Sequence, residues 1–230
     1  MKYKFGGAAV IALGGSIIHP KEIDTLFIKN FHKFILEQIA TNKKFIIVAG
    51  GGSVARDYQK AASAVVRIED EDKDYLGIHA TRLNAHFLRT IFFKQANPTV
   101  IDKRFKIRSL DHQVTIASGW KPGWSTDYVA LQLAHDFKIG EVIIAGSPSH
   151  VFNKDPKKYN DAKPIEKISW ADYRKLIPEK WIPGAHSPVD PVGAALAREK
   201  KLKAVIINGT DLNNFGKLLA GNEFEGTIIE

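Results

Sequence analysis

The chain has 230 residues, of which 44% are hydrophobic and 25% charged, so it can bury a sizeable core and is not a disordered tail. No apolar run approaches the roughly 20 residues that cross a bilayer, no signal-peptide pattern opens the chain, and the absence of cysteine excludes disulfides and thiol nucleophiles, so we expect a cytoplasmic protein. The net charge of +8 suits an anionic partner, but the lysines are dispersed without interleaved aromatics, which favours a solvated basic surface over a nucleic-acid interface.

Short β-rich runs alternate with longer helical runs along the whole chain. Asp24 is placed to cap the first long helix, and Ser53 is placed to cap the second. An irregular segment covers residues 147–166. The predicted strands cover residues 10–13, 45–49, 98–101, 114–118, 141–146, 203–208 and 226–230. The predicted helices cover residues 25–39, 54–65, 75–95, 126–137, 170–176, 191–201 and 212–219.

This alternation predicts an α/β protein with a largely parallel sheet, in one domain over residues 1–230 or in two closely packed lobes. Ligands of such sheets gather at the carboxyl ends of the strands. Three predicted strands finish there in glycine: at Gly14 and Gly15, at 50–52, and at Gly119 with Gly123 beyond it. One glycine after a strand is ordinary turn chemistry, but three such breaks let backbone N–H groups approach phosphate closely. We therefore predict a phosphate-rich ligand.

The common nucleotide motifs do not fit these glycines. The sequence GxxxxGK followed by Ser or Thr does not occur, which excludes a P-loop enzyme. The run "GGGSVA" is a poor match to GxGxxG, although the alanine at its third position leaves a dinucleotide site open. The eight histidines show no metal-binding spacing, so we expect no metal held by protein side chains.

Seven segments resemble the amino acid kinase superfamily, and within it the archaeal type of uridylate (UMP) kinase. They include "IALGGSII", "VAGGGSVARDYQKAA", "GWKPGWSTDYVALQLA" and "VIINGTDLNNFGKLLAGNEFEGTIIE", and they occur in the family's order over nearly the whole chain. The resemblance implies a three-layer α/β/α sandwich that assembles as a homo-oligomer, usually a hexamer. It also implies transfer of the ATP γ-phosphoryl group to UMP, with Mg²⁺ carried by the phosphates.

The resemblance places the acceptor nucleotide in the N-terminal part and ATP in the part from about residue 140. It implies that Gly14, Gly15 and Ser16 lie under the transferring phosphoryl group, where backbone N–H groups follow its charge. Arg56 on the following helix supplies a fixed cation.

On the acceptor side, the resemblance implies that Gly51 approaches the phosphate and that Asp74 holds the ribose hydroxyls. Residues 120–126, here called the acceptor loop, surround the nucleotide, and Thr126 provides a hydroxyl. The acceptor loop consists of Trp120, Lys121, Pro122, Gly123, Trp124, Ser125 and Thr126.

On the ATP side, the resemblance implies that Gly52 approaches the donor phosphates, while Phe152 and Asp155 lie beside the adenosine. Four of the assigned residues have a purely structural alternative. Arg56 is then an exposed helical arginine, Asp74 a helix cap, Phe152 a core aromatic, and Thr126 the cap of its own helix.

One position and one stretch depart from the family pattern. Many superfamily members carry a lysine where this chain has Ala12, but the archaeal uridylate kinases also lack it, so the cation must come from elsewhere. The stretch 145–152 aligns with a family sequence resembling "TNVDGVY", in which Gly146, Ser147, Ser149 and His150 replace threonine, asparagine, aspartate and glycine. Because this loop borders the ATP site, loss of the carboxylate weakens the organisation of the donor phosphates or alters nucleotide choice.

The two tryptophans of the acceptor loop stand where smaller or more polar residues are usual. They stack on a base, fill the pocket or pack at a subunit contact. The leading function is a UMP kinase, and a kinase with another small phosphorylated or acidic acceptor remains open. A catalytically altered nucleotide-binding or regulatory protein is the second class. A third interpretation, RNA binding through the basic charge, predicts an affinity that falls steeply with salt.

Overall fold

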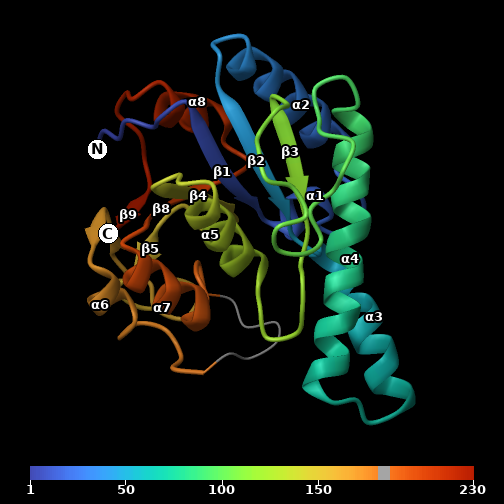
Figure 1. Cartoon of the computed structure of the whole chain (residues 1–230). Helices are drawn as coiled ribbons and strands as arrows, with labels where there is room; N and C mark the ends of the chain where they lie inside the picture. Colours follow the sequence, from blue (N-terminus) through green and yellow to red (C-terminus); the bar gives the residue numbers. More distant parts are fainter. Residues whose placement is uncertain (181–186) are drawn as a thin grey trace.

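The structure is a computed structural model that describes residues 1–180 and 187–230 (Figure 1). Its centre is a seven-stranded sheet with the order β3-β2-β1-β4-β8-β9-β7. The strands from β3 to β8 are parallel, β9 is antiparallel to β8, and β7 is parallel to β9. The strands of this sheet are β1 Ala8–Leu13, β2 Lys44–Ala49, β3 Val114–Ala117, β4 Glu141–Gly146, β7 Lys167–Ile168, β8 Lys203–Asn208 and β9 Thr227–Ile229.

Helices cover both faces of the sheet and complete three layers, as predicted (Figure 1). One hydrophobic core lies between the sheet and α2, α4 and α8, and the other lies between the sheet and α5, α6 and α7. Strand β1 serves both cores, since Ile11 belongs to the first and Val10 to the second. This two-sided burial explains why its sequence is apolar without alternation. The helices are α1 Gly15–Ile18, α2 Thr25–Ile39, α3 Gly52–Val65, α4 Asp70–Ile91, α5 Thr126–Asp136, α6 Trp170–Tyr173, α7 Pro191–Lys200 and α8 Leu212–Leu219.

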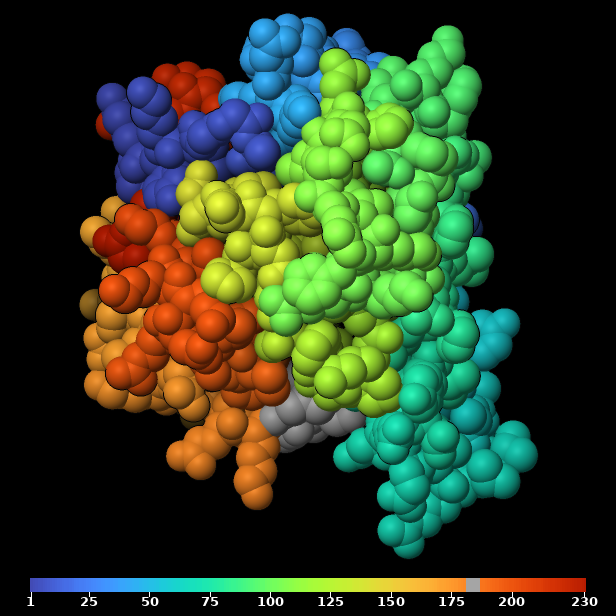
Figure 2. Space-filling model, in the orientation of Figure 1, coloured from blue at the N-terminus to red at the C-terminus, as the bar shows by residue number. Residues whose placement is uncertain are grey.

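Helices α3 and α4 lie side by side and extend beyond the carboxyl ends of the strands (Figure 1; compare Figure 2). Helix α4 is the longer of the two, with 22 residues. Its lower half flanks the edge where the parallel strands end, and its upper half packs on the first core through Leu88. The pair therefore forms a wall beside the predicted site. Among the described residues, no helix is both long and apolar enough to cross a membrane.

Most predicted elements are present, but one cap assignment and one helix start differ from expectation. Asp24 caps α2 as predicted, because its side chain accepts from the backbone N–H of Phe27 at 2.9 Å. Ser53 does not cap α3: the helix already begins at Gly52, and the Ser53 hydroxyl bonds to His19 instead. Helix α4 begins at Asp70, earlier than the predicted Tyr75, because three acidic residues fill its first turn and favour its positive end.

Segment 98–101 was predicted as a strand but forms only isolated bridges. Ala96 and Ile101 each pair with a β3 residue at a single point, and the residues between them follow a bend. Asn97 explains the interruption, because its side chain accepts from the backbone N–H of Thr99 and turns the chain. The irregular segment 147–166 contains one short antiparallel pair, β5 Val151–Phe152 with β6 Pro164–Ile165.

Candidate active site

Glycines line the edge where the central strands end. Because β1 is in register with both of its neighbours, Gly14 and Gly50 leave the sheet side by side. The Gly50 N–H donates to the carbonyl of Leu13, and the Gly14 N–H donates to the carbonyl of Ala145, each at 2.9 Å. Gly209 continues the row beside the end of β4 with another bond of 2.9 Å. The sequence prediction that separate glycine breaks share one edge is confirmed.

The turns after β1 and β2 touch through their backbones. A Cβ atom on Gly15 would lie 2.0 Å from the nitrogen of Gly52 and 2.5 Å from that of Gly51. Gly52 also has a φ of +70°, which residues with a side chain rarely adopt. Hence this contact, here called the glycine junction (Gly14, Gly15, Gly50, Gly51 and Gly52), accepts no side chain at its centre. The N–H groups of Gly51 and Gly52, at the start of the 14-residue helix α3, suit an anion.

Helix α4 holds three loops of the site with polar side chains from successive turns. The buried Asn84 donates from Nδ2 to the carbonyl of Gly50 at 2.7 Å. One turn earlier, the hydroxyl of Thr81 accepts from the N–H of Gly119 at 2.8 Å. Near the start of the helix, Oδ2 of Asp74 accepts from the N–H of Gly123 at 2.7 Å.

These contacts change the interpretation of Asp74. The alternative that Asp74 caps the long helix is wrong, because Glu69 precedes the first turn and Asp74 lies inside the helix. Its carboxylate instead fixes the acceptor loop at Gly123, whose φ of +79° marks a tight turn. Asp74 therefore stands at the loop to which the resemblance assigns the acceptor nucleotide.

The far end of the acceptor loop is held by a buried carboxylate that the sequence analysis missed. Ser125 caps α5, because its hydroxyl oxygen accepts from the N–H of Tyr128, and the same hydroxyl donates to Asp190. Asp190 is 4% exposed and caps α7, accepting from the N–H groups of Val192 and Gly193 at 2.8 and 2.9 Å. Thr126 is thus the first residue of α5 and not its cap. The start of α5 and the start of α7 are joined through one carboxylate.

Asp127 adds a second acidic group at this point. Burial raises the pKa of Asp127 from its usual range to about 8, and the negative charge of Asp190 adds to the increase. A carboxyl group with a raised pKa is a common feature of functional sites. No metal-binding spacing or catalytic motif used in the sequence analysis draws attention to it.

The two tryptophans have different environments. Trp120 belongs to the second core and is 8% exposed, and its indole N–H donates to the carbonyl of Ile101 at 3.3 Å. Trp120 therefore packs in the hydrophobic core, which is not one of the three roles that the sequence left open. Trp124 is only partly buried, with its ring centroid 4.4 Å from that of Tyr128 and Lys121 Nζ 4.1 Å from its own centroid. Pro122, which lies between the two tryptophans in the sequence, is partly buried.

The predicted ATP side is more open than the acceptor side. Gly146 ends β4 at the glycine row, and Ser147 after it is exposed. Phe152 lies in β5 with the ring of His150 6.2 Å away, and Asp155 is exposed with its carboxylate accepting from the N–H of Lys157. Among the described residues, no hydrogen bond joins Phe152 or Asp155 to the glycine junction.

Ser16, Ala12 and Arg56 complete the predicted set. Ser16 lies in α1 and is exposed, directly after the glycine junction. Ala12 is buried in β1 at 4% exposure, in the second core. Arg56 is exposed on α3 one turn after Gly52, and within residues 1–180 and 187–230 its guanidinium has no hydrogen bond or ion pair. Arg56 thus has the exposure of the structural alternative, and its charge is not committed elsewhere.

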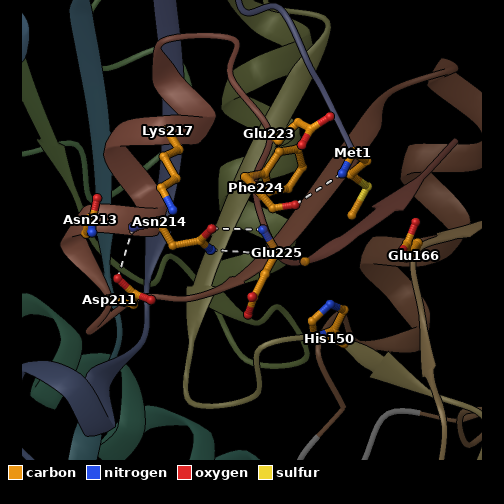
Figure 3. Close-up of a pocket in the computed structure, with 11 residues that line it drawn as sticks. Met1, His150, Glu166, Asp211, Asn213, Asn214, Lys217, Glu223, Phe224 and Glu225 are labelled. Atoms are coloured by element: carbon orange, nitrogen blue, oxygen red, sulfur yellow. Dashed lines mark hydrogen bonds between the residues drawn. The ribbon is translucent and has the colours of Figure 1, made fainter.

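A cavity of about 370 Å³ lies between α8 and the chain leading into β9 (Figure 3). Several acidic side chains, Lys217 and the terminal ammonium group line it, and that ammonium group donates to the carbonyl of Phe224 at 3.3 Å. None of the predicted site residues lines this cavity. Its lining residues are Met1, His150, Glu166, Asp211, Asn213, Asn214, Lys217, Glu223, Phe224, Glu225 and Gly226.

The fold and the glycine junction define an α/β protein whose parallel strands end at a glycine-lined edge. Residues 7–208 match the amino acid kinase family, and the chain belongs to that family. The uridylate kinase of Thermococcus sibiricus is 31% identical over 225 residues, covering 96% of this chain and 98% of its own. The uridylate kinase of Staphylothermus marinus is 30% identical over 197 residues, covering 85% and 88%.

Solved structures show the same fold. The crystal structure of uridylate kinase from Archaeoglobus fulgidus covers this chain and its own in full, with a TM-score of 0.82 and 29% identity. The UMP kinase of Bacillus anthracis has a TM-score of 0.79 at 22% identity, over 97% of this chain and 96% of its own. The predicted family and the predicted α/β/α fold are both confirmed.

Proposed function

We propose that the protein transfers the γ-phosphoryl group of ATP to UMP and releases ADP and UDP. One observation carries the proposal: Gly15 and Gly52 pack backbone against backbone, so amides of two turns meet where no side chain fits. The chain's similarity to uridylate kinases over 96% of its length supports the choice of acceptor.

In this reaction an oxygen of the UMP phosphate attacks the γ-phosphorus, and the bond from that phosphorus to the β,γ-bridging oxygen breaks. Phosphoryl transfer depends mainly on orientation and on stabilisation of developing charge. The amides of Gly15 and Ser16 supply donors to the transferring group, and Gly14, whose own N–H donates to the carbonyl of Ala145, lies beneath it without a side chain. Arg56, whose side chain is exposed on α3, swings toward the phosphates and adds a full positive charge.

The acceptor nucleotide lies between the glycine junction and α4 in this proposal. Gly51 approaches its phosphate, and Asp74 accepts from the ribose hydroxyls while holding Gly123. Trp124 offers a partly buried aromatic face to the base, since Trp120 is committed to the core. Lys121, Pro122, Ser125 and Thr126 form the rest of the wall.

The donor nucleotide lies over the ends of β1, β4 and β8. Strands β4 and β8 belong to the part of the chain from about residue 140, to which the resemblance assigns ATP. Gly52 approaches its phosphates, and Phe152 and Asp155 lie beside the adenosine. Gly146 and Ser147 line the floor without charge, and Ala12, buried in the second core, supplies none, so neutralisation depends on Arg56, lysines and the metal. Mg²⁺ would enter with the phosphates and neutralise their charge. The described residues contain no group of three or more His, Asp or Glu side chains that would hold it alone.

The proposal extends to the whole protein. We expect one functional domain over residues 1–230, a cytoplasmic location and assembly as a homo-oligomer, a hexamer according to the family resemblance. The absence of cysteine supports a reducing compartment.

A second candidate function is nucleotide binding without transfer. The loop after β4 favours it, because Ser147, Ser149 and His150 leave no carboxylate to organise the donor phosphates. The His150 ring instead bonds through Nδ1 to the Ser149 hydroxyl at 3.0 Å.

A coupled ADP-release assay separates the two candidates. Purified protein with Mg²⁺ and ATP is given UMP, CMP and other small phosphorylated acceptors in turn, and the product is identified by chromatography. The proposal predicts turnover that depends on UMP and forms UDP. Tight ATP binding with no turnover on any acceptor would establish the second candidate instead.

A further inference from the structure

A histidine and a serine meet at the glycine junction, and the proposed reaction assigns no role to either. His19 ends α1, and Ser53 lies in the first turn of α3. Nδ1 of His19 and Oγ of Ser53 form a hydrogen bond of 2.7 Å, in which the tautomer of the ring decides the donor. Ser53 is 7% exposed, so water competes little for its hydroxyl, and the bond gains strength from its surroundings.

The main chain makes a second link between the same two residues. The Ser53 N–H donates to the carbonyl of His19 at 2.9 Å, and the His19 N–H donates to the carbonyl of Gly15 at 2.8 Å. A Cβ atom on Gly52 would lie 2.8 Å from the His19 oxygen, so the two backbone segments are already in contact. The first turn of α3 is therefore attached to the turn after β1 by main chain and side chain together.

This attachment matters for the spacing of the phosphate-binding amides. Ser53 directly follows Gly52, and the chain from Gly15 to His19 is a single short turn of helix. If the two glycine turns move slightly relative to one another, the N–H groups of the turn after β1 move relative to those of the turn after β2. Displacements of about 1 Å in an active site lower rates by up to about 100-fold.

We propose that His19 is a positioning residue for phosphoryl transfer, whose ring fixes the spacing of the two glycine turns through Ser53. The role rests on the proposed function, because the spacing affects turnover only if the phosphates lie between these turns. It needs no charge on the ring, because a neutral imidazole forms the bond in either tautomer.

Isosteric variants separate this role from a direct contact with substrate. Asparagine places its amide near the position of Nδ1 and can donate or accept there, whereas glutamine places it near Nε2. We expect His19→Ala and His19→Gln to lower kcat about tenfold with the KM values for UMP and ATP within about twofold. We expect His19→Asn to restore kcat to within about threefold of the wild type.

Ser53→Ala is the matched variant on the other side of the bond. It should lower kcat as much as His19→Ala, and the double variant should be no slower than either single one, because both remove the same interaction. Thermal unfolding of every variant checks that the protein is folded under the assay conditions.

Amide hydrogen exchange in the first turn of α3 gives a readout that does not depend on turnover. His19→Ala should exchange the amides of residues 52–54 several times faster than the wild type, and His19→Asn should restore them. If the wild type does not phosphorylate UMP, the proposed function fails while exchange still tests the link. Unchanged amide exchange and unchanged kcat in folded His19→Ala would overturn the proposal. A kcat that is restored by His19→Gln and not by His19→Asn would also overturn it.

Discussion

The glycine junction and the acceptor loop belong to one site but are built in opposite ways. At the junction, main chain touches main chain, and a single Cβ on Gly15 would collide with two backbone nitrogens. The acceptor loop is held by side chains, from Asp74 at Gly123 to Asp190 at Ser125. Main-chain packing leaves no freedom for substitution, whereas side-chain anchors can be changed one at a time. The part that handles phosphate should therefore be intolerant of change, and the part that chooses the acceptor should be adjustable.

The largest effect is expected at the junction. Gly15→Ala places a Cβ 2.0 Å from the nitrogen of Gly52, and neither backbone can move without separating β1 from β2. We expect at least about a 100-fold loss of turnover in the coupled assay, about 2.7 kcal/mol of transition-state stabilisation. Gly140→Ala is the matched control, because nothing lies within 4 Å of its added Cβ. Equal activity of the two variants would contradict the idea that main-chain contact defines the junction.

The buried anchor of the acceptor loop should give the next largest effect. Asp190→Ala leaves the hydroxyl of Ser125 and the N–H groups of Val192 and Gly193 without their acceptor. We expect a loss of about 2 kcal/mol in the free energy of unfolding, measured by urea denaturation. Ser125→Ala removes one of these contacts and should cost about 1 kcal/mol. If Asp190→Ala and Ser125→Ala lower the free energy of unfolding equally, Asp190 does not join the starts of α5 and α7.

A smaller effect, confined to UMP, is expected at Asp74, the other anchor of the acceptor loop. Asp74→Asn keeps an oxygen that can accept from Gly123 but loses the charge and one acceptor for the ribose. The KM for UMP should rise about tenfold, and the KM for ATP should stay within about twofold. Asp70→Asn, on the exposed first turn of the same helix, is the control and should change neither value. Parallel increases for both nucleotides would remove Asp74 from the acceptor side.

The last prediction concerns the dependence of stability on pH. The Asp127 carboxyl ionises near pH 4 in the unfolded chain, while its pKa in the folded protein is raised to about 8. Between these values the unfolded state releases a proton that the folded state keeps, so this group lowers stability as pH rises. Asp127→Asn should therefore raise Tm relative to the wild type more at pH 8 than at pH 5. A difference in Tm that is constant or falls over this range would show that Asp127 ionises freely in the fold.

The sequence predicts the junction better than the loop, for a physical reason. Two backbones can touch closely only where the residues are glycine, so such a contact is visible in the sequence. Gly14, Gly15 and the run at 50–52 stand at strand ends that apolar patterning already reveals. Their meeting follows from the parallel register of β1 and β2. The Ser53 cap failed because a partly buried histidine partner competes with the helix amides for its hydroxyl, and sequence spacing does not show which partner prevails.

The side-chain anchors depend on contacts between distant segments, which a single sequence does not show. Asn84 and Thr81 look like ordinary polar residues of a helix, yet they hold glycines 34 and 38 residues away. Asp190 and Ser125 are 65 residues apart. Only Asp74 was found, and it was found by resemblance to a family and not by its spacing.

The most direct test of the account is a crystal structure with a bisubstrate analogue that joins adenosine and uridine through a phosphate chain. The account predicts that backbone nitrogens of Gly15, Gly51 and Gly52 lie about 3 Å from phosphate oxygens, with the uridine beside Asp74. A phosphate chain bound away from this junction, or held there by side chains alone, would contradict it.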